Sequence, residues 1–251
     1  MNIEVILTPA ELPTLARSDL RETVCVVFDV LRATSTFVTA LHNGAKAVIP
    51  ASEISEALAI HRKQPDCLLG GERDGVKIRA AQTGGTDFDL GNSPREFTSE
   101  RVRGKTIVST TTNGTRALRA CAGAKTVLAG SFLNLAATAE FIKNLQPAEV
   151  LLVCAGTGEK TALEDALAAG ALCESLALGD ARPTISDSAE IARFAWTQGK
   201  PDLAGAFQAS TNARRLLAIP ELRDDVTFCL QRDVFLLIAR MEADGAIRTL
   251  V

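Results

Sequence analysis

Residues able to bind an anion or a metal follow the first long apolar run of the sequence, residues 24–28. Asp29 comes directly after this run, and Arg32, Ser35 and Thr36 follow it. An ionised carboxylate at the end of a buried strand is costly unless it is paired or ligates a metal. Arginine offers a planar fork to phosphate or carboxylate, and a hydroxyl can cap a helix. The segment therefore predicts either an anion and metal site or a helix cap with a structural Asp–Arg pair.

A second candidate site is the hydroxyl-rich stretch 110–116. Glycine lets the backbone approach a ligand, and the positive end of a helix disfavours a nearby cation, so an arginine there favours an anionic partner. The alternative is a capping turn with a solvated arginine. As an anion site, the stretch supplies Thr112, Asn113, Gly114, Thr115 and Arg116.

Acidic residues also follow the strand-like run at residues 149–154. Glu164 and Asp165 come after a glycine-containing segment, and acids in a first helical turn can simply complement the helix dipole. Adjacent helical residues point in different directions, so we expect only one of the two to face a site. Two weaker segments add Glu72 with Arg73, and Asn92 with Ser93.

The elements that must position these residues alternate along the chain. Short β-branched runs predict strands at 3–7, 23–29, 47–50, 105–109, 125–129 and 149–154. Alanine- and leucine-rich stretches predict helices at 34–43, 54–63, 115–121, 133–144, 162–178, 188–198 and 203–217, and then a strand at 226–230 and a helix at 233–242. Apolar strands separated by helices indicate an α/β fold, a three-layer α/β/α arrangement with a mostly parallel central sheet. Ligands bind such sheets beyond the carboxyl ends of the strands.

Composition narrows the class of protein. The 251 residues carry a net charge of −3, so no global field attracts nucleic acid or an anionic membrane. We see no signal peptide, and no apolar run approaches the ~18 residues of a membrane span. Six dispersed cysteines indicate a reducing compartment, and two histidines argue against a histidine-rich metal site. We predict a cytoplasmic single domain over residues 1–251, and leave the oligomeric state open, with a homodimer as one alternative.

Familiar phosphate motifs fail here. A P-loop needs glycine before Lys160-Thr161, where Glu159 stands. A cysteine phosphatase built on Cys154 would need arginine at position 160, and an Asp-x-Asp phosphatase would need an acid in place of Leu31. From the residues alone, the conclusion stops at an anion and metal site in an α/β enzyme.

Five segments together nevertheless resemble the signature blocks of the 2-phosphosulfolactate phosphatase family, in the family's order. They are residues 28–36, 70–73, 88–94, 111–116 and 154–165, with a weaker block at 225–229. The sequence departs from the family's pattern at residues 79–86, a longer link, and at Glu159, where a glycine is expected.

The resemblance implies a Mg²⁺-dependent phosphatase that converts (2R)-2-phospho-3-sulfolactate to 3-sulfolactate and phosphate, a step towards coenzyme M. We expect a related phosphorylated 2-hydroxy acid, or anion binding without catalysis, as the alternatives. The predicted metal ligands are Asp29, Glu72 and one of Glu164 and Asp165. Attack by a metal-activated water is favoured over an aspartyl-phosphate on Asp29. The predicted catalytic residues are Asp29, Arg32 and Arg116. The predicted substrate-binding residues are Ser35, Thr36, Arg73, Asn92, Ser93, Thr112, Asn113, Gly114 and Thr115.

Overall fold

A computed structural model describes residues 1–178 and 183–250 of the chain. Its strands are β1 (Asn2–Ile6), β2 (Thr23–Phe28), β3 (Ala47–Pro50), β4 (Leu68–Arg73), β5 (Val76–Lys77), β6 (Thr106–Thr110), β7 (Thr126–Gly130), β8 (Glu149–Cys154), β9 (Thr184–Ile185), β10 (Ile238–Met241) and β11 (Ile247–Leu250). Its α-helices are α1 (Leu12–Leu15), α2 (Ala33–His42), α3 (Ile54–Lys63), α4 (Ala80–Thr83), α5 (Ser99–Val102), α6 (Gly114–Ala120), α7 (Leu135–Leu145), α8 (Leu163–Leu176), α9 (Asp187–Gly199), α10 (Leu203–Ala209), α11 (Thr211–Leu217) and α12 (Arg223–Cys229).

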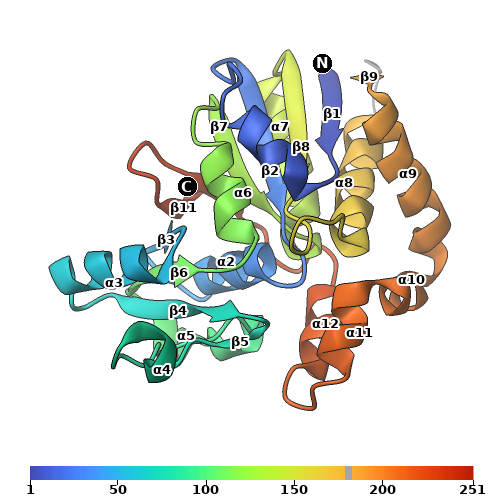
Figure 1. Cartoon of the computed structure of the whole chain (residues 1–251). Helices are drawn as coiled ribbons and strands as arrows, with labels where there is room; N and C mark the ends of the chain where they lie inside the picture. The colour runs from blue at the N-terminus through green and yellow to red at the C-terminus, as the bar shows by residue number, and fades with distance from the viewer. Residues whose placement is uncertain (179–182, 251) are drawn as a thin grey trace.

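The described strands form one eleven-stranded sheet in the order β5-β4-β6-β3-β11-β10-β7-β2-β8-β1-β9 (Figure 1). Strands β9, β1, β8, β2 and β7 pair in parallel, as do β3, β6 and β4. The C-terminal hairpin β10–β11 joins these two parallel parts by antiparallel pairing to β7 and β3. The predicted α/β fold with a mostly parallel sheet is confirmed.

The apolar core lies on both faces of the sheet because the strands are apolar on both sides. Val26 and Leu152 belong to one large cluster with residues of α7, α8 and α9, whereas Val27 and Val153 belong to another with residues of α2 and α6. Successive strand residues point to opposite faces, so the two clusters are the two cores of a three-layer arrangement. All six residues of β2 are buried, which fixes the position at which Asp29 leaves the sheet.

Two predictions for the C-terminal region are wrong. Residues 226–230 were predicted as a strand, but residues 226–229 belong to helix α12, whose first turn carries Asp224 and Asp225, and Leu230 is its C-cap. Acids in a first turn complement the helix dipole, and Asp225 is fully buried against partners far away in sequence. Residues 233–242, predicted as a helix, instead lead into β10. Pairing of β10 with both β7 and β11 overrides the local helical pattern.

The predicted helix 203–217 is broken into α10 and α11 at Ser210. The Ser210 hydroxyl caps α11 by accepting from the Ala213 N–H, and it also donates to Glu164. Strand β4 was not predicted, because two adjacent glycines argue against a strand interior. Gly71 is required there, since a Cβ would stand 2.2 Å from the Thr110 carbonyl oxygen.

In the part of the chain that is described, no helix is long and apolar enough to cross a membrane. The single-domain prediction stays a prediction, and residues 179–182 and 251 of its range lie outside the described residues.

Candidate active site

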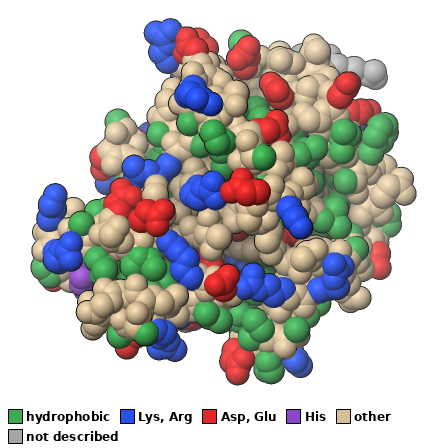
Figure 2. Space-filling model, in the orientation of Figure 1, with side chains coloured by type: hydrophobic (Ala, Val, Ile, Leu, Met, Phe, Trp, Pro, Cys, Tyr) green, Lys and Arg blue, Asp and Glu red, His purple; other side chains and the backbone are tan. Residues whose placement is uncertain are grey.

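A cavity of about 530 Å³ opens where the carboxyl ends of β2, β4, β6 and β8 meet α11. Basic and acidic side chains gather near the middle of this face of the molecule (Figure 2). The cavity is lined by Asp29, Leu31, Arg32, Glu72, Asp74, Gly75, Asn92, Thr112, Asn113, Gly156, Thr157, Gly158, Glu159, Lys160, Thr211, Asn212, Arg215 and Leu216. The strand ends thus converge as the sequence predicted.

Asp29 is held at the floor of the cavity by the start of α2. Its Oδ1 accepts a hydrogen bond of 3.0 Å from the Ala33 N–H, and the Thr34 hydroxyl accepts one from the Asp29 N–H. A Cβ on Gly114 would stand 2.5 Å from Asp29 Oδ2. Gly114 therefore makes room for the carboxylate, and the substrate binding predicted for it stays a prediction.

The carboxyl of Asp29 lies in an environment that disfavours its charge. Burial raises its pKa to about 7, and the nearby charges of Glu72 and Glu164 act in the same direction. The hydrogen bond from Ala33 and the charge of Arg32 lower the pKa, but they do not offset the burial. A carboxylate with this surplus of negative charge around it would be stabilised by a cation.

Glu72 faces the same cavity from the end of β4. Its Oε1 accepts hydrogen bonds from the N–H and the hydroxyl of Thr112, at 2.8 and 2.9 Å. Its Oε2 accepts from the Gly75 N–H at 2.7 Å. The carboxylate is thereby fixed between the β6 loop and the turn that follows β4.

Arg32 is buried, and its charge is compensated by Asp225. Its Nη1 lies 2.7 Å from Asp225 Oδ2, and its Nη2 donates to the Gly75 carbonyl oxygen at 2.7 Å. The hydroxyl of Ser93 donates to the other oxygen of Asp225, also at 2.7 Å. Ser93, predicted to bind substrate, therefore supports Arg32 through Asp225 and does not line the cavity itself.

Glu164 and Asp165 lie behind the cavity wall. Asp165 accepts from the backbone N–H groups of Val30 and Gly156, at 2.8 and 3.0 Å. Glu164, fully buried, accepts from the Ser210 hydroxyl and from the Asn212 amide. Both predicted metal ligands thus fasten loops of the site to one another, and neither lines the cavity.

Amide side chains complete the wall. Asn113 donates to the carbonyl oxygens of Ala155 and Gly158 and accepts from the Gly158 N–H, so it ties two strand-end loops together. Asn92 is only 6% exposed, and its buried side-chain oxygen has no hydrogen-bond partner among the described residues. A buried polar atom without a partner costs free energy, so the Asn92 side chain is held at an energetic cost in the wall of the cavity.

The remaining predicted residues lie outside the cavity lining. The hydroxyl of Ser35 donates to the Val30 carbonyl oxygen and that of Thr36 to the Asn92 carbonyl oxygen. These side chains fix the backbone around the site, and neither caps α2, whose N-cap residue Arg32 makes no side-chain capping hydrogen bond. Three more predicted residues make contacts outside the cavity. Arg73 donates to the Glu72 carbonyl oxygen and the Thr110 hydroxyl, and the Thr115 hydroxyl donates to the Thr111 carbonyl oxygen. Arg116 forms an ion pair with Glu159 at 3.2 Å.

Several lining residues are absent from the site predicted from the sequence, among them Lys160, Asn212 and Arg215. Asn212 and Arg215 lie three residues apart on α11, a spacing that places them on one face. No neighbouring glycine or strand end marks that helix as part of a site. Only the break at Ser210 turns it towards the cavity, and the helix predicted over 203–217 hid this signal.

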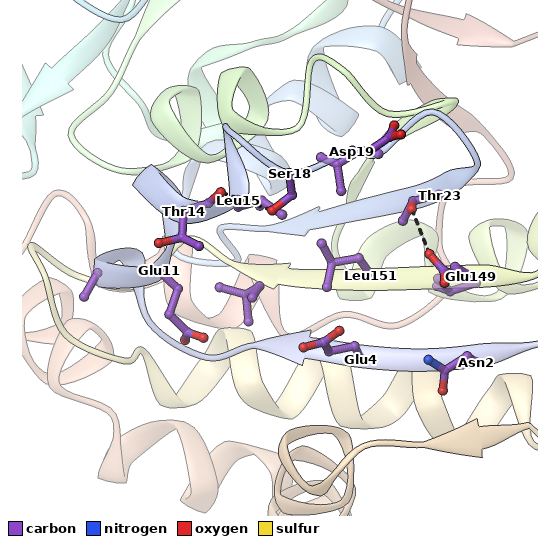
Figure 3. A pocket seen from close by; sticks show the side chains of 14 residues that line it. Asn2, Glu4, Glu11, Thr14, Leu15, Ser18, Asp19, Thr23, Glu149 and Leu151 are labelled. Atoms are coloured by element: carbon purple, nitrogen blue, oxygen red, sulfur yellow. Dashed lines mark hydrogen bonds between the residues drawn. The ribbon is translucent and has the colours of Figure 1, made fainter.

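A second cavity of equal volume lies between β1, β8 and α1 (Figure 3). Figure 3 shows Glu4 and Glu149 on neighbouring strands, with the Thr23 hydroxyl donating to Glu149. Glu11 and Asp19 also line this cavity, and its lining contains no lysine or arginine. The cavity at the strand ends is also lined by four acids, but Arg32, Lys160 and Arg215 line it too, so it suits a phosphorylated acid better.

The predicted arrangement of three protein carboxylates around one ion is not assembled. Within residues 1–178 and 183–250, no group of three or more His, Cys, Asp or Glu side chains is placed to hold a metal. Asp29 and Glu72 are the two carboxylates from the predicted set that line the cavity.

Comparison with known proteins identifies the family. Residues 7–244 match the 2-phosphosulpholactate phosphatase family. A protein from Caldanaerobacter subterraneus is 39% identical over 92% of both chains, and one from Clostridium acetobutylicum is 33% identical over 95% of this chain and 96% of its own. A protein from Caldicellulosiruptor saccharolyticus is 48% identical over 60% of this chain and 61% of its own. All three are named probable 2-phosphosulfolactate phosphatase, so the names support the predicted class of enzyme, a phosphoric monoester hydrolase. The predicted resemblance is confirmed, and the chain belongs to the 2-phosphosulpholactate phosphatase family.

Proposed function

We propose that this chain is a phosphatase that hydrolyses (2R)-2-phospho-3-sulfolactate to 3-sulfolactate and phosphate. The observation that carries the proposal is the convergence of Asp29, Glu72 and Arg32 in one cavity at the strand ends. Two carboxylates and a compensated arginine can bind both a cation and a phosphoryl group. The family and the names of its members supply the substrate.

The donor set fits Mg²⁺. Magnesium in phosphoryl-transfer sites is held by one or two carboxylates, with water and substrate oxygens filling the remaining positions. Asp29 and Glu72 provide two carboxylates, and the pKa of Asp29, raised to about 7 by burial first and then by Glu72 and Glu164, reflects negative charge that a cation would offset. Two histidines in the whole chain and six dispersed buried cysteines argue against softer metals.

Asp29 and Glu72 would therefore hold the ion, which would supply Lewis-acid neutralisation of charge on the phosphoryl oxygens. Arg32 would add positive charge at the same depth of the cavity, since its guanidinium is fixed by Asp225 and by the Gly75 carbonyl. Preorganised charge of this kind contributes most of the acceleration in phosphoryl transfer.

In the proposed reaction a water oxygen forms the new bond to phosphorus, and the bond between phosphorus and the C2 oxygen breaks. The C2 oxygen takes up a proton and leaves as the hydroxyl of 3-sulfolactate, and inorganic phosphate is the second product. The deep location of Asp29 and Arg32 favours entry of the phosphoryl end first, with the acidic groups of the substrate towards the mouth.

The test is release of inorganic phosphate from synthetic 2-phosphosulfolactate by the purified protein. We expect turnover with Mg²⁺, loss of turnover in excess EDTA, and recovery when Mg²⁺ is restored. Asp29→Asn, shown by thermal unfolding to be at least as stable as the wild type, should lose activity by about two orders of magnitude or more. Binding of the substrate without any phosphate release would replace the phosphatase by a non-catalytic anion-binding protein of the same fold.

Release from 2-phospholactate but not from 2-phosphosulfolactate would assign the protein to a related phosphorylated 2-hydroxy acid. Full activity after exhaustive EDTA treatment would contradict the magnesium requirement and leave the phosphatase assignment in place.

A further inference from the structure

The cationic side chains that line the cavity differ in whether their charge is compensated by a carboxylate. Arg32 is buried at the floor and forms an ion pair with Asp225 at 2.7 Å. Lys160 and Arg215 also line the cavity, and within the described part of the chain neither lies within ion-pair distance of a carboxylate. Two positive charges at the mouth are thus available to an anion from outside.

Arg215 is placed at the mouth by the turn between β4 and β5. Its Nη2 donates to the Asp74 carbonyl oxygen, and its guanidinium lies over Gly75, where a Cβ would stand 3.5 Å from Nη2. From the other side of the same turn, Arg32 donates to the Gly75 carbonyl oxygen. Two guanidinium groups therefore approach one turn at two depths, Arg32 buried and Arg215 exposed.

Helix α11 holds Arg215 in a fixed position relative to the floor. Asn212, three residues earlier on the same face, donates to the Thr157 hydroxyl at 2.6 Å and to Glu164 Oε1 at 2.8 Å. The Ser210 hydroxyl donates to the other oxygen of Glu164. A cation on a rigid element recognises an anion with less loss of conformational entropy than one on a free loop.

A nearly buried amide side chain, that of Asn92, also belongs to the cavity wall. The side-chain oxygen of Asn92, a residue that is 6% exposed, is buried and lacks a partner among the residues described. Asn92 lines the same cavity as Arg215 and Arg32. The wall of the cavity is therefore polar beside the cations, as binding of a polar ligand requires.

We infer that Arg215, assisted by Lys160, is a specificity-determining residue that binds the second acidic group of the substrate, a carboxylate or sulfonate, at the mouth of the cavity. The inference rests on the proposed function, in which the phosphoryl group occupies the floor. A guanidinium offers two parallel N–H groups to either oxyanion. Its present partner is a neutral carbonyl, so an anionic partner at the mouth would strengthen the interaction.

The test compares substrates with and without the second acid. Kinetics are measured for 2-phosphosulfolactate, 2-phospholactate and 4-nitrophenyl phosphate, which has no second acidic group. Arg215→Ala should raise KM for 2-phosphosulfolactate about 10- to 100-fold, the effect of a lost charged hydrogen bond, and should change kcat/KM for 4-nitrophenyl phosphate less than about threefold. A similar rise in KM with 2-phospholactate assigns the carboxylate as the bound group, whereas a rise with 2-phosphosulfolactate alone assigns the sulfonate.

Arg214→Ala is the matched control, because Arg214 is the neighbouring arginine of α11 and does not line the cavity. Arg214→Ala should leave KM and kcat/KM unchanged for all three substrates. Arg215→Lys should recover part of the loss, since it keeps the charge but not the planar fork. Equal losses with all three substrates, or no loss with any, would overturn the inference.

A calorimetric arm separates this inference from the proposed phosphatase. The probe is 3-sulfolactate, which carries both acids and no phosphoryl group. Weaker binding to Arg215→Ala than to the wild type and Arg214→Ala supports the inference even where no phosphate is released. Equal binding to all three proteins contradicts it even where the phosphatase activity is present.

Discussion

Arg32 Nη1 lies 2.7 Å from Asp225 Oδ2, and both side chains are almost completely buried although they are 193 residues apart in sequence. The pair joins the floor of the cavity to helix α12. Two charges at this depth stabilise each other only as a pair, because removal of one leaves the other uncompensated in a poorly polar environment.

We therefore expect Asp225→Ala to lower the free energy of unfolding by about 3–5 kcal/mol, the usual cost of breaking a buried ion pair. Asp225→Asn should cost less, since the amide can still accept from Arg32. Urea denaturation measures both. Glu22→Ala is the control, because Glu22 pairs with Lys125 on the surface, where the side chains are 79% and 53% exposed. An exposed pair contributes about 1 kcal/mol or less. Similar losses for Asp225→Ala and Glu22→Ala would contradict this view of the pair.

The raised pKa of Asp29 makes stability depend on pH. Burial, with smaller contributions from Glu72 and Glu164, raises this pKa from its usual 3.8 to about 7. The folded state then binds the proton more tightly than the unfolded state, so stability is greatest at low pH and is lost as pH rises through about 7. Three pKa units correspond to about 4 kcal/mol at most.

In metal-free buffer, Asp29→Asn should therefore be more stable than the wild type at pH 8, and the difference should shrink towards pH 5. Urea denaturation at several pH values, with EDTA present, checks this. Asp19→Asn is the control, since Arg21 lowers the pKa of the exposed Asp19 to about 2, and its ionisation is constant over that range. A difference between wild type and Asp29→Asn that does not vary with pH would refute the raised pKa.

The alternation of apolar runs was sufficient to predict the parallel sheet and the place of the site. Strands β2, β6 and β8 are largely buried, so each is visible in the sequence as its own apolar run. The ends of β2 and β6 then indicate where Asp29, Thr112 and Asn113 lie. The hairpin β10–β11 could not be predicted in this way, because its structure depends on pairing with β7 and β3, distant strands that local propensity does not report.

Contacts with distant segments also decided which predicted residues face the site. Glu164 and Asp165 carry the residue types of metal ligands, but their hydrogen bonds to Asn212 and to Val30 come from distant segments. Arg215 is the converse case: it lines the cavity, although nothing in its own helix marks it as part of a site. Residue type and strand ends indicate which loops converge, whereas the direction of each side chain depends on contacts made across the fold.

The cysteines should be dispensable for activity. Cys154 is fully buried, and burial first, then the charge of Asp165, raises the pKa of its thiol well above the usual range, which leaves it protonated. A protonated, inaccessible thiol is not a nucleophile. Cys154→Ala should keep kcat within about threefold of the wild type, with a loss of stability of about 1 kcal/mol or more from the small cavity left behind. Loss of activity by about three orders of magnitude in a folded variant, the size expected for a lost nucleophile, would show that Cys154 takes part in the chemistry.

The roles of Arg116 and Arg32 can be separated by one pair of substitutions. The sequence predicted that Arg116 clamps the phosphoryl group. In the structure its side chain is 42% exposed, pairs with Glu159 at 3.2 Å and lies outside the cavity lining, whereas Arg32 is buried and lines the cavity. Arg116→Ala should therefore change kcat/KM by less than about threefold, as expected for an exposed ion pair. Arg32→Lys, which keeps the charge beside Asp225, should lower kcat/KM about 100-fold, because a preorganised group facing the transferred phosphoryl group contributes that much. Steady-state kinetics with 2-phosphosulfolactate and thermal unfolding of both variants measure these effects. If Arg116→Ala instead loses activity about 100-fold at an unchanged melting temperature, the phosphoryl group binds at residues 112–116 and not beside Arg32.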